Sequence, residues 1–126
     1  MPFDIDRAAN YARQHVHPPF GEGKCAKHIR LAIREGGIDI GNTMSAKNYG
    51  FKLENAGFVR VHSLPQKGDV VVMQPWSGAA GNSMHGHMAI YDGSRWISDF
   101  IQQDIYPNEN YRQHKPPYQL YRYIGQ

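Results

Sequence analysis

The sequence has very little cysteine: Cys25 is the only one among 126 residues. A solitary thiol excludes a disulfide within the chain, so it serves either as a small buried apolar group or as an activated nucleophile. Long apolar runs are also missing, because the longest aliphatic stretch, residues 70–73, is far too short to cross a bilayer. We therefore expect no membrane insertion.

Charge of one sign is not concentrated anywhere in the chain. The net charge is +3 with neutral histidines, and no run of lysine and arginine is dense enough to suggest nucleic-acid binding. This mild excess would suit an anionic polymer, but an ordinary solvated surface is the more common reason for such a charge. Residues 1–7 lack the basic and apolar regions of a signal peptide, so we expect synthesis in the cytosol.

The length and the apolar patterning suit a single domain over residues 1–126. Helices are predicted over residues 6–15, 25–35 and about 45–56. Strands are predicted over residues 58–61, 70–73, 86–91, 95–101 and 118–124, with a polar stretch after Pro107. This order predicts an α+β fold in which N-terminal helices pack on a small antiparallel sheet.

Cys25 stands at the predicted start of the second helix. The unpaired N–H groups and the positive dipole end of that helix would favour the thiolate and could stabilise an oxyanion. Gly21 and Gly23 lie just before it and would let the backbone and a substrate approach closely. These features favour a catalytic nucleophile over an inert buried thiol.

His87 is the preferred general base, because Gly86 leaves room beside it and the apolar strand that follows would hold its ring. Asp99 is predicted to orient the imidazole. If Tyr91 pairs with Arg95 across a three-residue loop, His87 faces Asp99 on the neighbouring strand. A two-residue loop would place Ser98 there instead.

Three further residues are candidates for substrate contact, namely Trp76, His85 and Tyr49. Trp76 lies in a loop before His87 and could form a cleft wall, or it could simply pack on the sheet. His85 and His87 share a strand face, but no cluster of acidic or cysteine ligands accompanies them. We therefore predict no metal and no cofactor.

Three segments resemble the NlpC/P60–CHAP superfamily of papain-like cell-wall hydrolases, and most of all the small amidase effectors of type VI secretion systems. They are GKCA at residues 23–26, KGDVV at residues 67–71 and GHMAIYDG at residues 86–93. NlpC/P60 enzymes usually carry Asp-Cys-Ser around the nucleophile, and the third member of their catalytic triad is often a histidine. Lys24, Ala26 and Asp99 stand in those places here, which favours the CHAP and amidase-effector branches.

The resemblance implies a papain-like fold whose small antiparallel sheet forms a half-barrel. It also implies metal-free cleavage of amides in peptidoglycan stem peptides or cross-links, with Cys25, His87 and Asp99 as the triad. Such an enzyme would be an antibacterial toxin or a phage-type lysin. It would be made in the bacterial cytoplasm and act in the target-cell periplasm, and an effector would have a cognate immunity protein. The alternatives are a protease or deamidase acting on a protein, and a non-catalytic wall-binding module.

Overall fold

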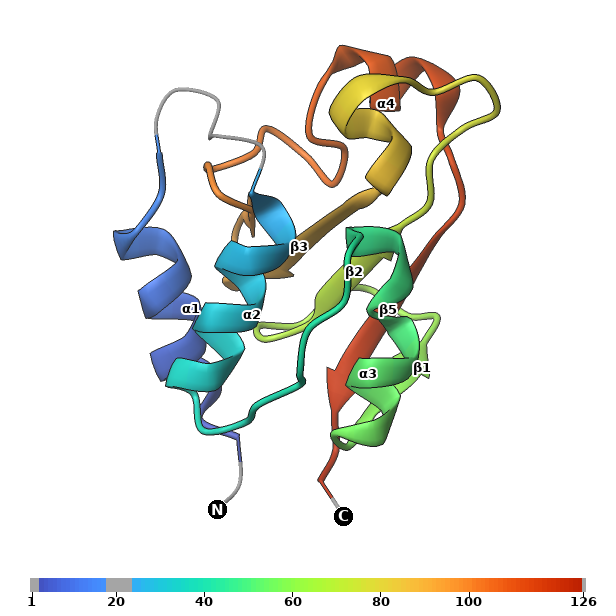
Figure 1. Cartoon of the computed structure of the whole chain (residues 1–126). Coiled ribbons are helices and arrows are strands. Elements are labelled where there is room, and N and C mark those ends of the chain that lie inside the picture. The colour runs from blue at the N-terminus through green and yellow to red at the C-terminus, as the bar shows by residue number, and fades with distance from the viewer. Residues whose placement is uncertain (1–2, 18–23, 126) are drawn as a thin grey trace.

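Five strands form one antiparallel sheet through the middle of the molecule (Figure 1). The computed structural model describes residues 3–17 and 24–125. The strands are β1 (Phe58–Val61), β2 (Val70–Met73), β3 (His87–Tyr91), β4 (Trp96–Ile97) and β5 (Tyr118–Tyr123), in the spatial order β1-β5-β2-β3-β4. The α+β class and the antiparallel sheet are confirmed.

In these described ranges, four α-helices accompany the sheet: α1 (Ile5–Gln14), α2 (Cys25–Glu35), α3 (Gly50–Asn55) and α4 (Glu109–His114). The carboxylate of Asp4 begins α1 by accepting the N–H of Arg7 at 3.0 Å. The predicted bounds of α2 are confirmed. Within the described ranges, none of the helices has the length and apolar character needed to span a bilayer.

The predicted helix over residues 45–56 is interrupted, and α4 was not predicted at all. A 3₁₀ turn, η1 (Ala46–Asn48), precedes α3, and the two meet at Tyr49. Gly50 is the first residue of α3, and a Cβ there would lie 2.5 Å from the Tyr121 hydroxyl. Asn108 is the N-cap of α4, and its side-chain oxygen accepts the N–H of Tyr111. The surrounding stretch is polar in a way that is typical of a loop.

Both faces of the sheet are covered, which explains the continuous apolar run in β2. Val70 and Val72 join the larger core with side chains from α1, α2 and α3. Val71 and Met73 join a second core on the opposite face, which includes Tyr111 of α4. Figure 1 shows α1 and α2 side by side, with α3 alongside β1 and β5. Each fully buried aliphatic side chain contributes about 1.5–3 kcal/mol.

Asp69 ties the start of β2 to β5. Its carboxylate is fully buried and accepts two hydrogen bonds from Arg122, Nε to Oδ1 and Nη2 to Oδ2, both at 2.8 Å. The N–H of Gln66 also donates to Oδ2 at 2.8 Å. The Gly-Asp pair before β2 therefore has a structural role, because it fixes how β2 enters the sheet.

Replacing Arg122 should test this role. In Arg122→Met the buried carboxylate of Asp69 loses its counter-charge, and we expect the free energy of unfolding to fall by about 3 kcal/mol in urea titrations. Arg7→Met is the matched control, because Arg7 and Glu35 form an ion pair whose side chains are 64% and 38% exposed. That change should cost less than about 1 kcal/mol. Equal losses for the two variants would contradict a special role for Asp69.

Candidate active site

A cavity of about 450 Å³ opens beside the start of α2. Its walls come from four parts of the chain: the first turns of α2, residues 42–49, the 3₁₀ turn η2 (Gly81–His85) with the start of β3, and residues 99–111. Cys25 and His87 both line it, so the structure brings the predicted nucleophile and the predicted base to one cavity. Asp99 lines the same cavity.

Cys25 is the first residue of α2, where it is partly buried and lines the cavity. Burial raises the pKa of the thiol to about 11. The negative charge of Asp99 acts in the same direction, whereas backbone N–H groups of Met88, Ala26 and Cys25 pull the pKa down. The helix start thus supports the thiolate, as the sequence suggests, but burial outweighs it. The free protein keeps a neutral thiol at pH 7.

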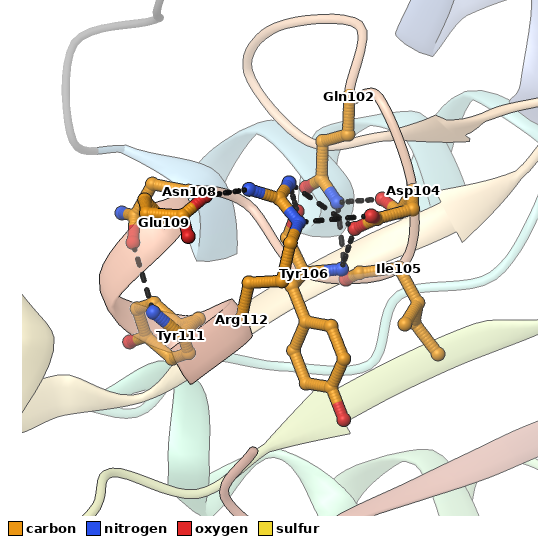
Figure 2. A network of polar contacts seen from close by, with 8 residues as sticks. All are labelled: Gln102, Asp104, Ile105, Tyr106, Asn108, Glu109, Tyr111 and Arg112. Carbon is orange, nitrogen blue, oxygen red and sulfur yellow. Dashed lines mark hydrogen bonds and ion pairs between the residues drawn. The ribbon is translucent and has the colours of Figure 1, made fainter. Parts of the chain in front are cut away.

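His87 is the first residue of β3, and its ring is buried with one nitrogen engaged. Its Nε2 lies 2.6 Å from Oε1 of Gln102. The amide nitrogen of Gln102 donates to the carbonyls of Asp104 at 2.9 Å and Ile105 at 3.1 Å (Figure 2). The amide oxygen must therefore face His87, so Nε2 carries the ring proton and Nδ1 keeps a lone pair.

The buried surroundings also keep His87 neutral. Desolvation lowers the pKa of the imidazole to about 4, against the opposing effects of the Gln102 hydrogen bond and the Asp99 charge. A neutral thiol and a neutral imidazole therefore share the cavity before any substrate arrives. Such a pair can act by proton transfer during attack.

The hairpin register differs from both predicted ones. Tyr91 pairs with Trp96 and Ile90 with Ile97, and β4 ends there. The cause is Asp92, whose carboxylate accepts the N–H groups of Ser94 and Arg95 at 2.8 and 2.6 Å and closes a four-residue connection. The prediction that pairing would set His87 opposite Asp99 or Ser98 is therefore wrong.

Asp99 is almost fully buried and contacts the helix that carries Cys25. Its Oδ2 accepts the N–H of Lys24 at 2.9 Å, at the N-cap position of α2. Its charge also raises the pKa of both Cys25 and His87. The hydrogen bond to His87 that we expected from Asp99 is made by Gln102, which the sequence did not reveal. Gln102 stands beside Gln103 in an irregular stretch, and nothing local distinguishes the two residues.

The predicted substrate contacts divide into two groups. Tyr49 and His85 line the cavity. The Tyr49 hydroxyl donates to Oδ1 of Asn42 at 2.8 Å, and His85 Nδ1 lies 2.7 Å from the Ser45 hydroxyl. Trp76 is not among the described residues that line the cavity.

Trp76 instead packs against the second core, which agrees with the alternative that its ring simply packs on the sheet. Its ring stacks on His114 at 4.4 Å and meets Tyr111 edge-on at 5.0 Å. The two glycines expected to give a substrate room, Gly21 and Gly23, lie outside the described residues. In the part of the chain that the structure describes, no three His, Cys, Asp or Glu residues gather as metal ligands.

The fold and the site together define an α+β protein with a partly buried cysteine and a buried histidine in one cavity. No family model and no curated protein matches the sequence. Two solved structures match closely, and both are type VI effector–immunity complexes, Tae3–Tai3, from Ralstonia pickettii. The native complex gives 49% identity and a TM-score of 0.88 over 96% of this chain and 99% of that one. The selenomethionine form of the complex gives 50% identity and a TM-score of 0.85, over 93% of this chain and 99% of that one. The chain belongs to the Tae3 family of type VI effectors.

Titration of His87 should make the protein less stable in acid. Its folded-state pKa of about 4 lies below the usual 6.5, so the unfolded chain binds the proton first as the pH falls. Stability should be complete above pH 6.5 and fall by about 3 kcal/mol toward pH 4, as measured by urea unfolding. The free energy of unfolding should change less with pH in His87→Gln than in the wild type. It should follow the wild-type pH dependence in His62→Gln, which alters an exposed histidine. If His87→Gln kept the full pH dependence of stability, His87 would not be the group whose titration destabilises the protein in acid.

Proposed function

We propose that this protein is a cysteine amidase or endopeptidase that hydrolyses amide bonds in peptidoglycan stem peptides or cross-links. The observation that carries the proposal is the meeting of Cys25 and His87 in one cavity, in a chain that belongs to the Tae3 family. The protein acts as an antibacterial type VI effector in the periplasm of a target cell. Because both matched structures are effector–immunity complexes, a cognate immunity protein is part of the proposal.

The reaction proceeds through a thioester. As Cys25 attacks the amide carbon, the Nδ1 lone pair of His87 takes the thiol proton, and the carbonyl oxygen becomes an oxyanion near the start of α2. The C–N bond breaks, and the imidazolium returns the proton to the departing amine. A water molecule then attacks the thioester with His87 again as base, which releases the carboxylic acid and restores the thiol.

Asp99 and Gln102 support this reaction in different ways. Gln102 fixes the tautomer and direction of His87 by accepting its Nε2–H. Asp99 supplies the negative charge that stabilises the imidazolium during attack, and it anchors the start of α2 through Lys24. The triad of Cys25, His87 and Asp99 thus remains our proposal, with Gln102 added as a positioning residue.

Substitution of Gln102 should affect the pH profile as well as the rate. Gln102→Leu should lower kcat by about 100-fold, because the ring loses its fixed tautomer. Gln102→Glu places a carboxylate on Nε2, so the pKa of His87 should rise and the acid limb of kcat/KM should move toward neutral pH. The control is Gln103→Leu, at an exposed neighbour. An acid limb that stays in place in Gln102→Glu would argue against the positioning role.

Digestion of purified sacculi tests the function itself. Wild-type protein should release muropeptides whose masses identify the cleaved amide, and Cys25→Ala should release none while keeping the wild-type unfolding midpoint. Modification of candidate target proteins without any muropeptide release would favour a protein deamidase or protease. Binding to sacculi with no cleavage by either form would favour a wall-binding module.

A further inference from the structure

One wall of the cavity is cationic. Lys27 and Arg30 line it from α2 and Lys24 from the N-cap position just before α2. Asp99 is the acidic member among the described lining residues. The carboxylate of Asp99 already accepts the N–H of Lys24. The mechanism proposed above uses none of these three cationic side chains, so their position within the cavity calls for a separate explanation.

Arg30 differs from the five arginines that form ion pairs among the described residues. Those residues each meet a carboxylate: Arg7, Arg13, Arg60, Arg112 and Arg122. Arg30 is half-buried, and its Nε is a buried atom without a hydrogen-bond acceptor among the described residues. Buried polar groups are nearly always paired, so an unpaired guanidinium N–H at a cavity wall points to an acceptor that a ligand brings.

We propose that Arg30, with Lys27 beside it, is an anion subsite that binds a carboxylate of the stem-peptide substrate. Lys27 and Arg30 are three residues apart on one helix and therefore share a face. A guanidinium matches a carboxylate in shape and charge, and the exposed ammonium of Lys27 adds attraction from the cavity mouth. The inference rests on the proposed function, because it names the substrate feature that the same cavity selects.

The spacing along α2 limits where that carboxylate lies. Arg30 follows Cys25 by five residues, which is about 7.5 Å along the helix axis. An extended peptide advances about 3.4 Å per residue. The recognised carboxylate therefore lies within about two to four residues of the scissile amide, because the reach of the Arg30 side chain adds to the axial spacing. A stem peptide, which carries free carboxylates near its amide bonds, meets this requirement.

Amidation of the substrate tests the subsite directly. Muropeptides would be purified, and half of the sample converted to carboxamides with carbodiimide and ammonia. Wild-type kcat/KM should fall at least about 10-fold on amidation, through KM, because the guanidinium loses its charged partner. Arg30→Gln should be about 10-fold weaker than wild type on the carboxylate form and should no longer distinguish the two forms. Lys27→Gln should show a smaller loss of the same kind.

Arg34→Gln is the matched control, because Arg34 lies one turn further along α2, is exposed and does not line the cavity. Arg34→Gln should prefer the carboxylate muropeptides over the amidated ones by the same factor as the wild type. The proposal is overturned if Arg30→Gln keeps the wild-type preference for carboxylates. It is also overturned if Arg30→Gln changes only inhibition by the immunity protein, which would make Arg30 a partner contact instead.

A binding measurement separates failure of the subsite from failure of the proposed function. Calorimetry with Cys25→Ala needs no turnover, and this variant should bind the carboxylate muropeptides at least about 10-fold more tightly than the amidated ones. The double variant with Arg30→Gln should lose that difference. If wild type cleaves neither form but Cys25→Ala shows the difference, the hydrolase proposal fails and the subsite stands. Equal binding of both forms to Cys25→Ala overturns the subsite.

Discussion

The hydrogen bond from the N–H of Lys24 to the carboxylate of Asp99 is the contact on which the arrangement of the site depends. Lys24 precedes the helix that carries Cys25, and Asp99 lies in the loop after β4. Three residues further along, Gln102 accepts the Nε2–H of His87. One short loop thus contacts both elements that bear the reacting groups, which lie far apart in the sequence. The loop is itself fixed, because the N–H of Gln102 donates to the carbonyl of Trp96 at 2.9 Å.

Desolvation determines the resting state of the pair. Burial moves the pKa of Cys25 up and that of His87 down, so neither group is charged near neutral pH. In the proposed reaction, charge separates only when the thiol proton moves to the imidazole, and the carboxylate of Asp99 then stabilises the cation. Before attack the same carboxylate disfavours the thiolate. In the proposed reaction, proton transfer is therefore concerted with attack.

The parts of the fold that depend on local sequence could be predicted, and the parts that depend on single side chains could not. The bounds of α2 follow from its apolar stripe and the glycines after it, and β2 follows from its apolar run. The hairpin register depends on the carboxylate of Asp92 binding two N–H groups, which no periodicity reveals. Gln102 was missed for a similar reason, since its role arises only when the loop folds its amide toward two carbonyls. Cys25 and His87 could be predicted as candidates because their chemistry and their places at element starts coincide, and the structure brings both to one cavity.

The proposed nucleophile and the proposed carboxylate subsite lie on one rigid element, α2. Ile29, Ala32 and Ile33 are fully buried, so α2 cannot shift without opening the larger core. The distance between Cys25 and the subsite at Arg30 is therefore set by helix geometry and not by a mobile loop. Opposite α2, β3 is held by β2, and β2 is held in turn by the ion pair of Asp69 and Arg122. A peptide that places a carboxylate on Arg30 would then present its amide to a thiol and an imidazole whose positions are already determined, so binding would need little rearrangement of the protein.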